Sequence, residues 1–309
     1  MANETNLGFE HRYAFAASPA TFSSGSLKLD PLSSTVKERS AIWRAMGLTG
    51  SRDPQASRRR KGLREVSGTL GFKASPRNLD FFLPFVLGAN ESTDAFNVAD
   101  ALPGFDMLED KFGTGDNADK FNECYVSRFT LNMSSSGQDG ILGMSLDVVG
   151  KTVAGGQAFT SAALGTTAGV DSPYTFYDTD GGITLVSGNG AIEIEEAVLT
   201  VENPLDVKFR NKRTAASIRA MDRTVTLVAR LPLTEDNYAD YFGDQASADA
   251  SIVIDNGTVV TTISLFNLEI ADEGPETQGL GESLLVLTGT SAADTSDPSV
   301  RWSVVGGSL

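Results

Sequence analysis

The sequence predicts a mainly β protein made of two similar modules, each with one short helix lying against a sheet. The first observation is a strand–turn–helix pattern that occurs twice, at 64–87 and at 223–242. In both copies apolar or small residues alternate at period two, as in a strand with one buried face. The second observation is that further strand-like stretches, separated by turn residues, follow each copy. The alternating residues of the two copies are Val66, Gly68, Leu70 and Phe72, and Val225, Leu227, Ala229 and Leu231.

Helix signals follow both strands in the same register. Ser75 and Thr234 stand at equivalent places, and both residue types are good helix N-caps. Pro76 occupies the first helical position, where its missing N–H does no harm. Apolar residues then recur four, seven and eight positions after each cap, which is the spacing of one helix face. They are Leu79, Phe82 and Leu83 in the first copy and Tyr238, Tyr241 and Phe242 in the second. The shared register favours a duplication, and two similar surfaces in one chain suit a ring or another symmetric assembly.

Residues 1–62 are polar and poorly periodic, so we predict an N-terminal arm. Within it, 40–46 predicts a short helix, followed by a turn at 47–50. The arm ends in a basic run at 58–61. This run indicates either a contact with an acidic neighbour or with DNA, or a solvated loop, and both interpretations stay open.

The first module is predicted at 63–150. After its helix, 89–120 is rich in Asp, Asn and Gly and reads as a long loop, of the kind that is functional or orders against a partner. Strands at 125–133 and 141–149 then form a hairpin through a Ser- and Gly-rich turn. Residues 151–182 are a low-complexity stretch of Gly, Ala, Thr and Ser, which indicates a linker or an arm.

The second module is predicted at 183–309. Its first strands are expected at 182–186 and at 191–202, where Asn203 and Pro204 end the strand. A loop with Gly274 and Pro275 is expected at 272–281. The remaining strands, besides the one in the repeated unit, are predicted at 251–254, 259–270, 283–287 and 300–305.

The composition describes a globular chain of 309 residues, long enough for two domains. No segment approaches the roughly 20 apolar residues of a membrane helix, and the N-terminus lacks signal-peptide features. Cys124 is the one cysteine, so an internal disulfide is excluded and synthesis in a reducing cytoplasm is expected. Because Cys124 lies inside a probable strand, we interpret it as a small packing residue.

The net charge of −15 argues against a broad nucleic-acid-binding surface, because phosphate binding needs an excess of Lys and Arg. The same charge fits a wall along which nucleic acid slides without sticking, or simply solubility. Glu193 and Glu195 alternate with Ile192 and Ile194 on a predicted strand, which indicates a face turned to solvent or to a lumen. If there is a lumen, we expect it to be net negative, with these two glutamates among the contributors.

A search for chemistry predicts no catalytic, cofactor-binding or metal-binding residue, and therefore no enzyme. His11 is the one histidine and lies in the irregular arm, which excludes a well-scaffolded Ser-His-Asp or Cys-His site as well as Cys/His zinc sites. The stretch 150–152 lacks the glycine of a phosphate-binding loop, because Ser145 stands at that place. Residues 178–181 lack the final bidentate Glu of a calcium loop and fit a β-turn.

The ordered series of segments resembles the tail tube (major tail) proteins of long, non-contractile-tailed bacteriophages. The series begins with 66–72 and its helix at 78–87, and it continues with 124–131. The stretch 197–205, followed by a basic linker and 223–227, is characteristic of that family. The closing segment 264–270 with its Gly-Pro loop completes the series, so the resemblance covers about residues 40–305.

The resemblance implies a structural virion protein with tube domains of two packed antiparallel sheets and a flanking helix. Such subunits self-assemble edge to edge into rings around an inner β-barrel, and the rings stack through loops and arms into a conduit for DNA ejection. The implied partners are further copies of the chain, the tail terminator and tail tip proteins, and a tape measure protein in the lumen. DNA passes through without specific binding, no membrane is involved, and assembly takes place in the host cytoplasm.

The resemblance also implies rings of six tube domains. Three chains would close such a ring if each module is one tube domain, whereas six chains would be needed if the modules form one larger domain. Three other functions remain as alternatives: a β-rich receptor-binding or adhesin module, a β-sandwich hydrolase, and the inner tube of a contractile injection machine.

Overall fold

The computed structural model describes ten segments of the chain, and everything below refers to them. They are 11–22, 26–44, 59–88, 95–112, 117–134, 140–159, 172–185, 190–234, 248–277 and 283–305. The predicted mainly β fold is confirmed, with large antiparallel sheets and one α-helix in these segments.

Eight strands lie before the predicted linker at 151–182, β9 lies within it and pairs with β7, and nine strands follow it. The first nine are β1 (Arg12–Ala17), β2 (Ser33–Ser34), β3 (Lys37–Arg44), β4 (Arg59–Lys73), β5 (Ala95–Asn97), β6 (Phe105–Asp110), β7 (Ala118–Ser134), β8 (Gly143–Gly150) and β9 (Thr152–Gln157). The second nine are β10 (Ile183–Thr184), β11 (Glu196–Glu202), β12 (Leu205–Lys208), β13 (Ser217–Ala220), β14 (Thr224–Pro232), β15 (Ala248–Asp255), β16 (Val260–Thr277), β17 (Ser283–Ser291) and β18 (Val300–Val305). The α-helix is α1 (Pro76–Leu87), and a 3-10 helix, η4, spans Phe176–Thr179.

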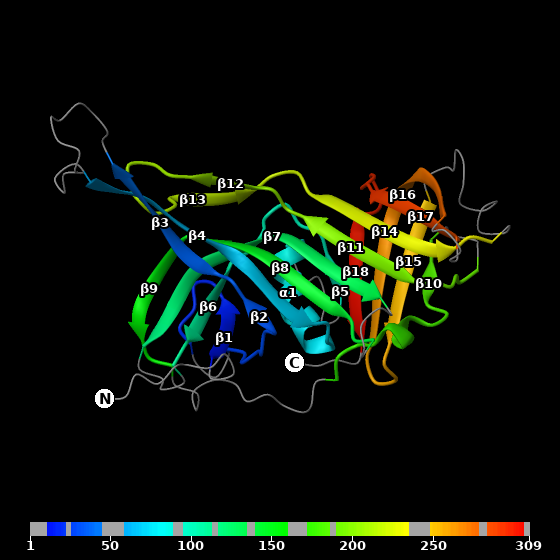
Figure 1. Cartoon of the computed structure of the whole chain (residues 1–309), viewed down its shortest axis with the longest axis horizontal. Coiled ribbons are helices and arrows are strands. Elements are labelled where there is room, and N and C mark those ends of the chain that lie inside the picture. The colour runs from blue at the N-terminus through cyan, green and yellow to red at the C-terminus, as the bar shows by residue number, and fades with distance from the viewer. Residues whose placement is uncertain are drawn as a thin grey trace.

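Sixteen of these strands join in one sheet, and β12 and β13 form a separate two-stranded ribbon. The main path of the sheet runs in the order β10-β15-β16-β17-β14-β11-β7-β8-β4-β2 (Figure 1). The two predicted modules meet where β7 pairs with β11 in antiparallel register, from Ser134 opposite Glu196 to Arg128 opposite Glu202. The predicted domain boundaries stay a prediction, but no gap in the sheet separates the two halves.

The first strand–turn–helix unit forms as the sequence predicts. The Ser75 hydroxyl accepts the backbone N–H of Asn78 at 3.3 Å, and Pro76 opens α1. The predicted face of Leu79, Phe82 and Leu83 is fully buried. In the second unit the strand is confirmed as β14, whereas the predicted helix after Thr234 lies outside the described residues.

The core lies between α1 and one face of the sheet. Phe82 of α1 is its centre, with ring centroids 5.1 Å from Phe72, 5.5 Å from Phe15 and 5.8 Å from Phe105. Aromatic pairs at these separations add to the free energy that burial already provides. Phe15 belongs to β1, so part of the predicted N-terminal arm packs into the core.

The predicted helix at 40–46 is wrong over its described part, because Lys37–Arg44 is strand β3 and pairs with β4. Helix propensity is a weak local preference, and the open edge of β4 offers a hydrogen-bonding ladder that overrides it. The bulge between Ser40 and Ile42 absorbs the mismatch in register.

Two predicted loops also turn out to contain strands. The stretch 89–120 holds β5, β6 and the start of β7, and the predicted loop at 272–281 holds the end of β16, as far as Thr277. All six residues of β6 are buried, its carboxylates as well as its apolar residues. The sequence therefore lacks the alternation of apolar and polar residues by which a strand is predicted. In β16, a register shift between Asp272 and Pro275 accommodates the proline that indicated a loop.

Candidate functional site

One face of the central sheet carries polar side chains, and the α-helix of the described residues packs on the opposite face. A row of hydroxyls crosses this face over five neighbouring strands, β8, β7, β11, β14 and β17. Its members lie directly opposite one another in register: Ser145, Thr130, Thr200, Thr226 and Thr290. All five are at least partly exposed. We refer to this surface as the polar face.

A second row on the polar face pairs each charge with a neighbour. The Arg128 guanidinium lies 2.5 Å from the Glu202 carboxylate across the β7–β11 ladder. The Thr69 hydroxyl donates to Asp147 at 2.6 Å, next to Arg128 in the register. On the other side of the hydroxyl row, six residues before Glu202 on β11, Glu196 stands opposite Arg230 with an ion pair of 3.0 Å. These pairs are exposed, so each contributes at most about 1 kcal/mol to stability, but none of the paired cations is free to hold another anion.

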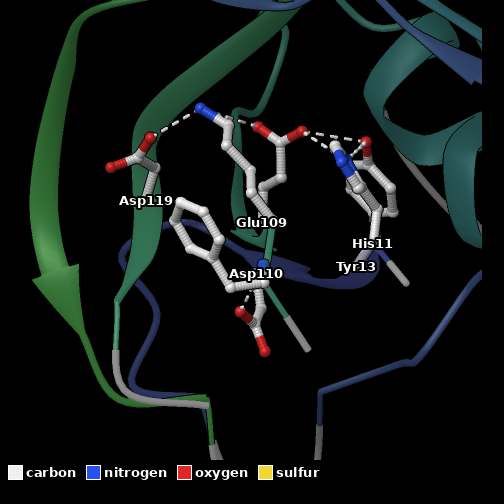
Figure 2. Close-up of polar contacts among 7 residues, drawn as sticks. His11, Tyr13, Glu109, Asp110 and Asp119 are labelled. Carbon is white, nitrogen blue, oxygen red and sulfur yellow. Dashed lines mark hydrogen bonds and ion pairs between the residues drawn. The ribbon is translucent and has the colours of Figure 1, made fainter. Parts of the chain in front are cut away.

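A network of buried and partly exposed polar groups joins β1, β6 and the N-terminal part of β7 (Figure 2). Tyr13 donates its phenol to Glu109 at 2.9 Å, and His11 approaches the same carboxylate at 3.6 Å. Lys111 lies 3.6 Å from Glu109 and 2.8 Å from Asp119. Burial and the Glu109 carboxylate raise the pKa of Tyr13 above its ordinary value, so the phenol stays protonated and acts as a donor.

Neighbouring carboxylates of β6 are also bonded within the chain. Asp110 lies 2.5 Å from the Arg12 guanidinium, across the β1–β6 pair. Asp106 accepts the backbone N–H of Glu123 at 2.9 Å, which holds a bulge where Glu123 has a φ of 48°. Lys120 lies 3.2 Å from Asp106. The described residues contain no group of three or more His, Cys, Asp or Glu that could hold a metal ion. We therefore interpret this network as structural, pinning β1 onto β6 and β7.

The model of the phage tail tube protein family matches residues 12–303, nearly the whole chain. The chain belongs to the phage tail tube protein family. A comparison with curated proteins gave no match. Membership in a family of tail tube proteins points to a structural and non-enzymatic protein of the bacteriophage virion, located in its tail. Among the described residues, no helix has the length and apolar character needed to cross a membrane.

The sequence-predicted acidic pair of this tail tube protein lies outside the strands. Glu193 and Glu195 precede β11, because the strand predicted at 191–202 begins only at Glu196. Ile192 and Ile194 pack against the core as the alternation predicts. The Ile192 N–H donates to the carbonyl of Ile183, and the Glu195 N–H donates to the carbonyl of Arg230. Within the described residues these isolated bonds do not extend into a strand ladder on both sides of the segment.

Other residues weighed from the sequence have structural contacts in this tail tube protein. Lys151 pairs with Glu123 at 2.8 Å, and Asp178 accepts the N–H of Thr175 at 2.7 Å at the start of η4. Cys124 is fully buried, as expected of a packing residue, and burial raises the pKa of its thiol. The hydroxyl row was missed from the sequence, although alternate Thr residues at 200, 224, 226, 288 and 290 were a visible signal.

Proposed function

We propose that the protein assembles into stacked rings that form the phage tail tube, and that the polar face lines the lumen through which DNA is ejected. The observation that carries this proposal is the continuous hydroxyl row of the polar face, which the described residues leave at least partly exposed. A sheet face without a covering layer needs either water or a partner beside it. Small hydroxyls present a smooth, hydrated wall, and this suits a channel for a long polyanion.

The charges of the polar face support a passage that does not retain DNA. Arg128 and Arg230 are each paired with a glutamate of β11. Phosphate binding depends on cations that release their counterions, and a cation already neutralised by a carboxylate contributes little. DNA would therefore slide past this wall without specific binding, as would a tape measure protein that occupies the lumen before ejection.

The edges of the sheet support assembly into rings. Within the described residues, β15 pairs along one side with β16, whereas on the other side β10 covers only Ile252 and Ser251. Edge strands with unpaired backbone groups promote pairing with another chain, and closure of a ring removes them. We propose that subunits pair through such edges, and that tail terminator and tail tip proteins close the ends of the tube after assembly in the host cytoplasm.

The proposed ring has three subunits, each with two tube modules, and the alternative is a ring of six subunits. Direct pairing of β7 with β11 supports the first count, because it joins the predicted modules side by side within one sheet. Such an arrangement gives pseudo-sixfold symmetry from three chains. Cryo-electron microscopy of assembled tubes tests this count, and true sixfold symmetry with identical neighbour contacts would rule the trimer out.

Electron microscopy of the purified protein tests the proposed function itself, with rings or hollow tubes as the expected result. A cysteine probe tests the orientation of the polar face, because native Cys124 is buried and its thiol is unreactive. In Thr200→Cys, we expect a bulky thiol reagent to label soluble subunits but not assembled tubes. Equal labelling in both states would place the polar face outside the tube, and a strictly monomeric protein at high concentration would contradict the tube.

A further inference from the structure

Positive charge is concentrated in two β-ribbons of an otherwise acidic chain. One is the β3–β4 hairpin, at 37–44 and 59–65, and the other is the β12–β13 hairpin, at 205–220. Together these stretches hold twelve of the 25 Lys and Arg residues and only three acidic residues, a formal charge of +9 in a chain of −15. We refer to the two hairpins as the basic ribbons.

The basic ribbons form one surface although they lie about 150 residues apart in sequence. The backbone N–H of Arg64 donates to the carbonyl of Arg213 at 2.7 Å, and the Arg213 side chain donates back to Gly62 at 2.9 Å. Figure 1 shows β12 and β13 beside β3 and the start of β4, at one end of the longest axis.

Most of the charge on the basic ribbons is left for a partner. Arg64 pairs with Glu38 at 2.5 Å and Lys208 with Asp206 at 3.0 Å. The other exposed cations form no ion pair with any described residue: Lys37, Arg39, Arg59, Arg60, Lys61, Arg210, Lys212, Arg213 and Arg219. Nine like charges on one surface repel each other, so an acidic partner would stabilise them.

The β3–β4 ribbon also exposes apolar side chains among these cations. Ile42 is 64% exposed and Leu63 is 50% exposed, and Ile42 lies opposite Lys61 in the β-ladder. One exposed aliphatic residue is ordinary. Two on one ribbon with a charged surround have the composition of a docking surface, in which an apolar centre is enclosed by a polar rim.

The opposite end of the molecule carries the complementary charge. Residues 248–305, which form β15–β18, hold nine acidic residues and one arginine, a formal charge of −8. Asp249, Asp255 and Glu269 are exposed among them. These strands lie at the other end of the longest axis in Figure 1. Screening limits interactions between exposed charges to about 8–10 Å at physiological salt, so the two ends do not neutralise each other within one molecule.

We propose that the basic ribbons of one copy dock on the acidic β15–β18 end of a second copy. This inference rests on the proposed function, because it names the contact by which the tube subunits associate. The contact is heterologous, head to tail, and such contacts generate closed rings or open filaments depending on the rotation between copies. Opposite charge at the two ends orients the encounter, and Ile42 and Leu63 supply the apolar area buried on docking.

Paired charge reversals test the proposal. The basic-end variant is Arg60→Glu with Lys61→Glu, and the acidic-end variant is Asp255→Lys with Glu269→Lys. We expect each variant alone to need a protein concentration at least about tenfold higher than wild type for assembly, since like charges then face each other at the contact. We expect an equimolar mixture of the two variants to form complexes that neither forms alone, because each keeps one intact end. Analytical ultracentrifugation over a salt series measures the assembly.

A control with the same change in net charge as the basic-end variant is Lys28→Glu with Lys73→Glu, and we expect wild-type assembly from it. Both positions lie outside the ribbons. Circular dichroism and thermal unfolding establish that all variants fold. Assembly of the basic-end variant at the wild-type concentration, or an equal defect in the control, would overturn the docking contact.

Two further outcomes separate this inference from others. If wild type and both variants form tubes equally well, the proposed function stands and the docking contact is wrong. A wild type that never assembles counts against the proposed function itself.

The alternative occupant of the basic ribbons is DNA. Binding of random-sequence duplex DNA at physiological salt, abolished by Arg60→Glu with Lys61→Glu while assembly is unchanged, would assign the ribbons to DNA and refute the contact between copies.

Discussion

The Arg223 guanidinium donates from Nε to Oδ1 of Asn203 at 2.8 Å, and together these side chains close the C-terminal end of α1. Asn203 donates its amide to the carbonyl of Val86 at 3.0 Å, and Arg223 reaches that of Leu87 at 2.9 Å. The last carbonyls of a helix have no intrahelical partner, so these donors satisfy groups that would otherwise be buried unpaired. One contact thereby joins α1 to the end of β11 and the start of β14.

We expect Arg223→Ala to lower the free energy of unfolding by about 2–3 kcal/mol, because a charged donor is lost and buried acceptors stay unpaired. Burial lowers the pKa of Arg223, and the Asp100 carboxylate offsets part of this effect. Arg219→Ala is the matched control, with an exposed guanidinium and an effect within about 0.5 kcal/mol. Urea unfolding of the soluble subunit measures both, and equal effects would show that the contact stabilises nothing.

Phe82 contacts three other phenylalanines from β1, β4 and β6, and it is fully buried. We expect Phe82→Ala to cost about 3–5 kcal/mol, because the side chain leaves a cavity between α1 and the sheet. Phe112 is 58% exposed, so Phe112→Ala should change stability by less than about 0.5 kcal/mol. Thermal unfolding compares the two variants; a small loss in Phe82→Ala would mean that α1 is not anchored through this side chain.

Tyr13 gives the protein an alkaline stability limit. Its pKa is raised in the folded state, first by burial and then by Glu109, so the folded state keeps the proton longer than the unfolded chain. This contribution is fully present below the ordinary tyrosine pKa of about 10 and is lost as the pH rises from there toward the folded pKa. We expect stability to fall less steeply above about pH 10 in Tyr13→Phe than in wild type.

The control for this pH dependence is Tyr177→Phe, because Tyr177 is 76% exposed. Its stability should follow the wild-type pH profile in urea unfolding. At neutral pH, Tyr13→Phe should itself be less stable by about 1–3 kcal/mol, since Glu109 loses a buried donor. Parallel profiles for Tyr13→Phe and wild type would contradict the assignment.

Hydrogen exchange on subunits and on tubes tests the predicted arms. We expect residues 1–62 or residues 151–182 to gain protection on assembly, as segments that contact neighbouring subunits should. Strands β1 and β3 in the first arm and β9 in the second stretch are exceptions, because they already pair with β6, β4 and β7 within the subunit. Equal protection of the arms in both states would assign them to the folded subunit and not to the assembly.

The sequence by itself determined the elements whose signals are local. Period-two alternation gave β4 and β14, and the N-cap Ser75 with Pro76 gave the start of α1. The hairpin of β7 and β8 followed from its alternation and its turn, and the ordered series of segments led to the tail tube family. The strand, cap and turn signals are local, and the series depends only on their order along the chain, so no knowledge of the folded chain is needed to find them.

The tertiary structure alone decided the features that depend on partners far away in sequence. Strand β6 reads as a loop because its carboxylates are charged, but Asp110 is buried against Arg12, 98 residues away. The hydroxyl row needs five strands in one register, and the basic surface needs the bond between Arg64 and Arg213. Whether a charge is buried, or whether hydroxyls align in a row, depends on residues that are distant in sequence. Composition and periodicity describe one segment at a time, so they could not reveal either feature.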